Sequence, residues 1–296
     1  MSAADTTAAP ATRAPSNSYW RLVFRRLRRN RPAMAGLVCL VVVILAAVTA
    51  PIIAPYDPMK VSLADAYQSP NAAHLMGTDK LGRDILSRVL WGSRNSLKTG
   101  FFAVLWGLAI GGVLGSLALW GGRIVDAVVM RFTDVLLAFP GILLAIGVIS
   151  WLGRGDVQMT LAVGLSLAPI FTRLLRASLL SLQESDFVLA LRSVGVPRRQ
   201  ILFRHMLPNA LTPLIVQATL QLGTTILTVA GLGFLGLGPE DPRIPEWGTM
   251  LIEGAQMIQT FPHLVLGPGA CLVAIVVSVN LLGDGLRDAL DPRVRR

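Results

Sequence analysis

The sequence has few of the residues that build metal sites and disulfide frameworks. Only 15% of its 296 residues are charged, and it contains two cysteines and three histidines. Cys39 and Cys271 lie within apolar stretches, where a cysteine behaves as a small hydrophobic residue. His74, His205 and His263 are far apart and have no companions at metal-ligand spacing. These scarcities exclude a disulfide-stapled domain and indicate that the chain binds no metal.

A nucleotide-binding loop is also missing. No Gly-x-x-x-x-Gly-Lys-Ser/Thr sequence occurs, and residues 77–84, the nearest match, have Arg83 and Asp84 in place of the lysine and the hydroxyl. Ser166 with His205 or His263 is the only available pair of nucleophile and base, and His205 is predicted to lie in a cytoplasmic loop. We therefore expect a non-catalytic chain that binds no cofactor of its own.

Apolar residues, in contrast, are abundant. They make up 53% of the chain, and the mean hydropathy is +0.60, which is too high for an ordinary soluble domain. Six blocks are long enough to cross a hydrocarbon core of about 30 Å, and segments this apolar must be helical in lipid. The predicted spans are residues 33–53, 97–119, 125–151, 157–180, 208–235 and 263–286. The sequence thus predicts an all-α polytopic membrane protein with six transmembrane helices.

The basic residues gather at the predicted membrane boundaries. They crowd the start of the first span, the loop after the fourth and the end of the sixth. Because lysine and arginine favour the cytoplasmic side, both termini are expected in the cytoplasm. The basic residues of the outward loop oppose this pattern, although its aspartates nearly balance them. The net charge of +10 therefore indicates lipid headgroups as partners and no nucleic acid.

Composition also predicts how the chain is divided. A signal peptide cleaved after Ala50 is an alternative to a retained first span, but Pro51 and the long leader argue against it. The expected parts are a disordered cytoplasmic tail (1–18), a surface helix with the first span (19–54), an extracytoplasmic loop (55–96), a five-helix core (97–287) with a cytoplasmic coupling loop (182–207) and an extracytoplasmic segment (238–262), and a cytoplasmic tail (288–296).

The loop after the fourth span carries the clearest local pattern. Asp186 is expected to cap the start of a helix, Gly195 suits the left-handed residue that ends one, and Pro197 prevents its continuation. An apolar stripe recurs at helical spacing, formed by Phe187, Val188, Ala190, Leu191 and Val194. From the residues alone, this short helix either docks on a partner protein or rests on lipid headgroups through Arg198, Arg199 and Arg204.

A few residues inside the spans also stand out. Pro140, Pro169 and Pro213 interrupt three different spans and are expected to bend them. Arg131 and Asp134 lie three positions apart near the start of the third span. We expect them to pair on one helix face, with a role in a transport pathway as the alternative.

These motifs carry a resemblance to a known family. Residues 190–195, Ala-Leu-Arg-Ser-Val-Gly, with His205 and Pro208 downstream, resemble the "EAA" loop of binding-protein-dependent ABC importer permeases. Further stretches are similar to the second, C-type permease subunit of dipeptide, oligopeptide and nickel importers: residues 74–97, 134–140, 234–238, 247–249 and 286–293. One departure is that Leu189 stands where the family has a glutamate, so a carboxylate that could complete a capping box is missing.

The resemblance implies a type I ABC importer permease fold in the bacterial inner membrane, with peptides as the commonest substrate. It implies a heterodimer with a homologous B-type permease, two ATPase subunits that bind ATP and magnesium, an extracytoplasmic solute-binding protein and surrounding membrane lipids. A secondary transporter or channel that works without ATPases is the alternative. That class should show inverted repeats and ionisable groups at mid-membrane, and the sequence shows neither.

The resemblance also implies roles for particular residues. Coupling to the ATPase is expected from Asp186, Phe187, Val188, Ala190, Leu191, Val194, Gly195, Pro197, Arg198, His205 and Pro208. An extracytoplasmic gate or receptor contact is expected from Gly77, Asp79, Arg83, Asp84, Trp247 and Gly248. Arg131, Asp134 and Pro140 are expected in the pathway or in helix pairing.

Overall fold

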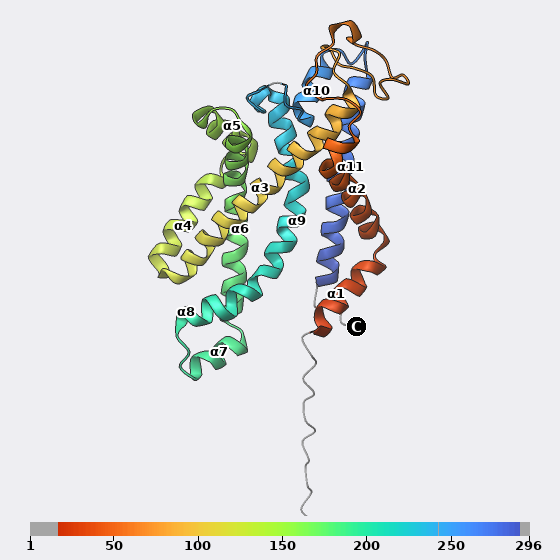
Figure 1. Cartoon of the computed structure of the whole chain (residues 1–296). Helices are drawn as coiled ribbons and strands as arrows, with labels where there is room; N and C mark the ends of the chain where they lie inside the picture. The colour runs from red at the N-terminus through yellow and green to blue at the C-terminus, as the bar shows by residue number, and fades with distance from the viewer. Residues whose placement is uncertain (1–16, 242, 291–296) are drawn as a thin grey trace, which may run out of the picture.

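The computed structural model describes residues 17–241 and 243–290, with the backbone alone at 17–20 and 22. The predicted tails, 1–18 and 288–296, therefore lie largely outside the described residues. Within the described part there is no β-strand, and a single isolated bridge joins Thr78 and Asp84. The prediction of an all-α chain is confirmed (Figure 1).

Most of the helices follow one another with short connections, and the long segment 54–84 separates α2 from α3. They are α1 (Asn17–Arg29), α2 (Arg31–Ile53), α3 (Ile85–Trp120), α4 (Gly122–Leu137), α5 (Gly141–Leu152), α6 (Asp156–Gln183), α7 (Asp186–Ser193), α8 (Arg198–Gln200), α9 (Leu207–Leu232), α10 (Trp247–Ala255) and α11 (His263–Leu290). A 3₁₀ turn, η1, occupies Leu63–Asp65, and two π-helical turns, η2 and η3, occupy Ile201–Met206 and Gly233–Leu237.

Among the described residues, five helical segments are long and apolar enough to cross a membrane, and the third predicted span differs from them. Instead of one helix over residues 125–151, α4 and α5 meet at an angle of 94°. Pro140 is the residue before α5 and has φ −55° and ψ 130°. A proline offers no N–H to the preceding turn and disfavours helical geometry in the residue before it, so the helix breaks there. Pro169 and Pro213, in contrast, lie inside α6 and α9.

The fifth predicted span begins earlier than the sequence indicated. α8, η2, α9 and η3 form one helical run, Arg198–Leu237, of 40 residues. Pro208 does not start this run; it is the second residue of α9 and lies two positions after the end of the π turn. A π turn changes the hydrogen-bond partners locally, so the missing N–H of a proline is tolerated next to it. The second half of the predicted loop 182–207 is therefore helical.

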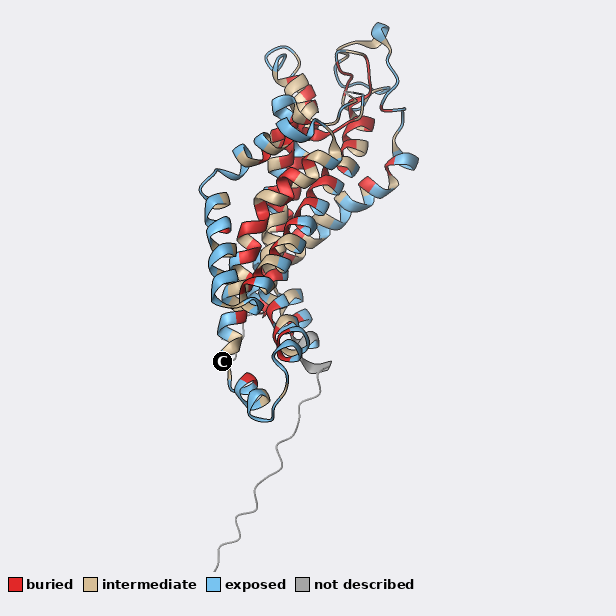
Figure 2. Cartoon of the chain, turned by 90° about the vertical axis from the view of Figure 1, so that its left-hand side faces the viewer, coloured by how far each residue is buried: buried red, intermediate tan, exposed pale blue. Residues whose placement is uncertain are grey.

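Close packing of α3 against α6 forms the centre of the bundle. Gly107, Gly111 and Gly115 of α3 all face α6, and a Cβ added at Gly111 would lie 2.5 Å from the Cβ of Phe171. Glycine at four-residue spacing lets two backbones approach closely, as expected for helices packing in a membrane. Buried residues run along the middle of the bundle, and exposed ones cover its outside (Figure 2).

The bundle has two functional ends (Figure 1). One end carries α7 and α8, and residues 185–197 are called the handle below. The opposite end carries residues 54–84 together with residues 238–262, which include α10. These two segments are called the cap.

Candidate functional site

The handle is a short helix closed by a left-handed glycine. α7 has 8 residues, and Gly195 has φ +80°. The N–H of Gly195 donates to the carbonyl of Arg192 at 3.0 Å, and that of Val196 donates to Leu191 at 3.0 Å. These bonds satisfy carbonyls that the end of the helix leaves free. The predicted helix end is confirmed.

The start of α7 differs from the prediction. Ser185, not Asp186, is the N-cap residue, with extended backbone angles of φ −75° and ψ 148°. Its hydroxyl donates back to the carbonyl of Leu182, so no side chain caps α7. Asp186 is the first helical residue, where a carboxylate interacts favourably with the helix dipole.

The two apolar faces of α7 have different surroundings. Val188 is 0% exposed and packs in a cluster with Leu175 and Leu179 of α6. Leu191 packs against the same cluster. Burying a valine side chain contributes about 1.5–3 kcal/mol, which anchors this face of the short helix.

The remaining residues of the predicted stripe point outward. Val194 is 76% exposed, Phe187 is 40% exposed, and Ala190 is also exposed. Residues at positions i, i+3 and i+7 share one face of a helix, so these three form a continuous apolar surface. We call it the outer face of α7. The single stripe expected from the sequence is therefore two faces, one buried and one free.

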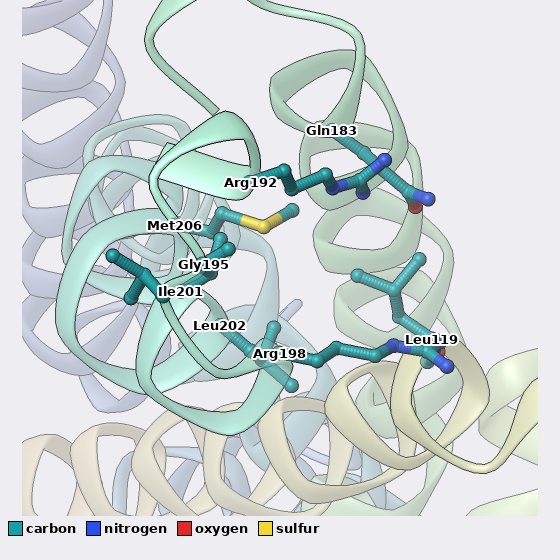
Figure 3. A pocket seen from close by; sticks show the side chains of 9 residues that line it. Leu119, Gln183, Arg192, Gly195, Arg198, Ile201, Leu202 and Met206 are labelled. Atoms are coloured by element: carbon teal, nitrogen blue, oxygen red, sulfur yellow. The ribbon is translucent and has the colours of Figure 1, made fainter. Parts of the chain in front are cut away.

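A pocket of about 480 Å³ lies between the handle and the ends of α3 and α6 (Figure 3). Arg192 and Arg198 reach across it toward Gln183 and Leu119. The Nη2 of Arg198 donates to the carbonyl of Leu119 at 2.7 Å, near the C-terminus of α3. A cation is favourable at that end of a helix, so Arg198 ties the handle to α3.

His205 and Pro208 lie outside the handle. His205 is half-buried in η2, and its carbonyl accepts a hydrogen bond of 2.6 Å from the side-chain amide of Asn209. Pro208 is exposed at the first turn of α9. The structure therefore brings the handle residues together and places these two on the helix that leads away from it.

At the opposite end, an ion network holds the two segments of the cap together. Arg83 is 1% exposed, and its Nε lies 2.6 Å from the carboxylate of Asp79 while its Nη2 lies 3.0 Å from Glu253. Arg88, also 1% exposed, lies 3.4 Å from Asp79 and 3.5 Å from Glu253. Two guanidinium groups thus face two carboxylates, and the exposed Lys80 adds a third cation 3.7 Å from Glu253. Opposite charges and several hydrogen bonds are what make a buried ion cluster tolerable.

Asp84 organises the start of α3. Its carboxylate accepts hydrogen bonds from the backbone N–H of Ser87 at 2.8 Å and from the Ser87 hydroxyl at 2.7 Å, and lies 2.9 Å from Nδ1 of His74. Nearby, Gly77 has φ +77°, and a Cβ there would lie 2.4 Å from the carbonyl oxygen of Gln68. Only glycine fits this position without strain.

Trp247 and Glu246 join α10 to α3. The indole of Trp247 is 0% exposed and packs on Gly92. Glu246 accepts hydrogen bonds from the N–H groups of Gly248 and Thr249 and from the hydroxyl of Ser96. Burial raises the pKa of Glu246, while these hydrogen bonds favour its ionised form and act against the shift.

The predicted receptor-contact residues are therefore interior. Asp79, Arg83, Asp84 and Trp247 are buried, and Gly248 packs so closely on α9 that an added Cβ would lie 2.0 Å from the carbonyl oxygen of Ala230. Their contacts hold the cap segments to each other and to the neighbouring helices.

The predicted pair of Arg131 and Asp134 is wrong. Asp134 accepts a hydrogen bond of 2.6 Å from Nη2 of Arg173 on α6, and no ion pair involving Arg131 occurs among the described residues. One turn further along α6, Arg176 forms a bidentate pair with Asp126. Both pairs link α4 to α6, because Asp126 and Asp134 of α4 pair with arginines of α6 and not with arginines of their own helix.

Sequence reasoning missed Arg88, Glu246 and Glu253 as site residues. Glu253 is an acidic residue within the apolar stretch of α10, and such a residue signals a buried partner. The position of its partners could not be foreseen, since Arg83 and Glu253 are 170 positions apart.

Comparison with known proteins shows that this helical bundle is a membrane transport permease. Residues 104–296 match the family model described as "Binding-protein-dependent transport system inner membrane component", and residues 18–70 match the "N-terminal TM domain of oligopeptide transport permease C". The chain belongs to the family of binding-protein-dependent transport system inner membrane components, the permeases of ABC importers.

Curated relatives match the chain over nearly its full length. The dipeptide transport system permease protein DppC of Alkalihalophilus pseudofirmus is 42% identical over 98% of this chain and 96% of its own. DppC of Haemophilus influenzae is 39% identical over 100% of both chains. The glutathione transport system permease protein GsiD of Pectobacterium atrosepticum is 42% identical over 93% of this chain and 92% of its own.

A solved structure shares the fold. It is an inward-facing conformation of the MetNI methionine ABC transporter, with a TM-score of 0.58 and 21% identity over 70% of this chain and 98% of that one. The predicted permease fold is confirmed.

Proposed function

We propose that this chain is one half of the permease of an ATP-driven importer for dipeptides or oligopeptides. Relatives named as dipeptide and glutathione permeases support a substrate with peptide bonds. In this proposal the chain lies in the inner membrane of a bacterium with both termini and the handle in the cytoplasm. The arginines around α1 and the handle support that orientation.

Coupling to ATP occurs through the outer face of α7, which docks in a groove of an ATPase subunit. The observation that carries this proposal is the exposure of Phe187, Ala190 and Val194 on a helix whose other face is anchored by Val188. An apolar helix face presented in this way suits recognition in a groove. Leu189, 48% exposed, adds apolar surface beside it.

ATP hydrolysis takes place on partner subunits. ATP and magnesium bind to two ATPase subunits, while this chain is non-catalytic and binds no cofactor. The absence of a phosphate-binding loop from its sequence supports this division of labour.

The substrate passes between this chain and a homologous B-type permease. Support comes from α4, whose Ile124, Val128 and Val135 are 80%, 63% and 58% exposed and offer an apolar face to a second subunit. Arg131, Asp134 and Pro140 lie on the same bent pair of helices and belong to the pathway or its helix pairing. A solute-binding protein docks on the surface of the cap.

The test uses the assembled importer reconstituted in vesicles with its receptor. The double substitution Phe187→Asp and Val194→Asp should abolish peptide uptake and receptor-stimulated ATP hydrolysis while the two permeases still assemble, because it places charge on the outer face of α7. Ser193→Asp is the control, since it adds one of these charges to a different face of the same helix.

Two results contradict the proposal. Undiminished ATP-driven uptake by the double variant rules out docking through the outer face. Uptake driven by an ion gradient without any ATPase supports the alternative, a secondary transporter or channel subunit.

A further inference from the structure

An apolar groove opens between α2 and α3. It has a volume of about 480 Å³, with its walls on α2 and α3 and its floor on α9 and α11. Its apolar lining includes Ile44, Val48, Leu97, Phe101, Leu222 and Ile226. All four helices are membrane spans, so the groove opens where lipid acyl chains lie.

Two basic side chains border the groove. Arg94 and Lys98 are one helical turn apart on α3, and both are exposed. Neither forms an ion pair with any described residue, and the guanidinium of Arg94 lies 5.9 Å from the centre of the Trp91 ring. Lys98 acts electrostatically on the carboxylate of Asp156, although the two form no ion pair. Exposed cations at the edge of a membrane lie where the phosphate groups of lipids can reach them.

The charged border lies at the cap end of the groove. Between the two cations, the side-chain amide of Asn95 donates to the carbonyl of Pro245 at 2.8 Å and the hydroxyl of Ser96 donates to Glu246 at 3.1 Å. This turn of α3 therefore touches the cap, at the membrane boundary. Phe101 lies further along α3, away from the cap. The groove is thus cationic at the boundary and apolar deeper in the membrane.

We propose that this groove binds one phospholipid of the leaflet on the cap side. Its phosphate lies against Arg94 and Lys98, and one acyl chain fills the groove between α2 and α3. A phosphate diester carries one negative charge and can accept charge-assisted hydrogen bonds from both cations, and the acyl chain of the lipid covers the apolar lining. A helix from another subunit would cover the lining but would leave both cations without an anion. The bound lipid joins α2 to α3 and α9.

The first test counts lipids that stay bound to the purified importer. Native mass spectrometry in mild detergent should find one phospholipid retained by the unchanged complex. The double substitution Arg94→Gln and Lys98→Gln should lower its occupancy about tenfold, the change that corresponds to roughly 1.4 kcal/mol. The matched control is Lys60→Gln with Arg154→Gln, which removes two exposed cations of the same end, outside the groove.

The second test identifies the occupant. A photoreactive benzoylphenylalanine in place of Val48, which lines the groove, should form a covalent adduct with a phospholipid after irradiation in vesicles. An adduct with another protein chain overturns the proposal, and so does equal lipid retention by the groove variant and its control. Neither test measures transport, so its outcome is independent of how the chain is coupled to ATP.

Discussion

The indole Nε1 of Trp247 donates a hydrogen bond of 3.1 Å to the carbonyl oxygen of Val89, a residue 158 positions earlier in the chain. This bond joins α10, which belongs to one cap segment, to the first turns of α3. Trp247→Ala should destabilise the importer by about 3–5 kcal/mol, the usual cost of removing a large buried aromatic side chain. Thermal unfolding of the purified complex measures it.

Trp247→Phe is the control for that loss. It keeps an aromatic ring against Gly92 but removes the hydrogen bond and the volume of the second ring, so it should cost less than the alanine substitution does. If the two variants unfold at the same temperature, the ring is not what holds α10 to α3.

The ion network of the cap gives a second prediction. Arg83→Met leaves the buried carboxylate of Asp79 with a more distant partner, Arg88, and should destabilise the complex by about 3 kcal/mol. Arg243→Met removes an exposed arginine at the same end of the molecule, and the unfolding temperature should stay unchanged. Unfolding of the two variants at one temperature would show that the network contributes no more than a surface pair.

Gly195 should affect how efficiently the handle couples ATP hydrolysis to uptake. Its φ of +80° is unfavourable for alanine, although an added Cβ would meet no atom within 4 Å. Gly195→Ala should therefore cost about 1 kcal/mol through the backbone alone and reduce ATP-driven uptake while assembly persists. Gly195→Asn should retain more uptake, because asparagine tolerates left-handed angles better. Equal losses in both variants would point to a contact of Gly195 with a partner instead.

The pairing of Asp134 with Arg173 is open to a double-mutant cycle. Asp134→Asn and Arg173→Gln should be non-additive by about 0.6 kcal/mol, a typical coupling between polar groups on membrane helices. Asp134→Asn and Arg131→Gln should be additive, since no ion pair joins those two residues. The measurement is the unfolding temperature of each single and double variant. Coupling to Arg131 instead would restore the pairing that the sequence favours.

The sequence predicted best what depends on neighbouring residues. Apolar block lengths gave the spans, and Gly195 gave the end of α7, because both follow from local backbone chemistry. The sequence did not predict the contacts that depend on segments far apart in the chain. Nothing near Asp134 in the sequence identifies Arg173 as its partner, and the division of α7 into two faces depends on Leu175 and Leu179 lying beneath Val188.

The helix breaks at Pro140 but not at Pro213, and the sequence alone does not predict this difference. Both prolines interrupt apolar blocks, yet only the first separates two helices at 94°. α9 stays continuous because it is packed along much of its length, whereas α4 and α5 are exposed over large parts of their surfaces. A proline weakens the helix at both positions, and the packing of the surrounding residues decides whether the helix breaks there.

The run Arg198–Leu237 begins beside the handle and reaches the cap, where Gly248 rests directly on Ala230. Forty residues at helical rise correspond to about 60 Å, more than the thickness of a bilayer. One continuous stretch of chain, which includes two π turns and a non-helical residue at Gly236, therefore extends from the handle to the cap. In the proposed importer, a movement of the handle would be passed along this stretch to the cap.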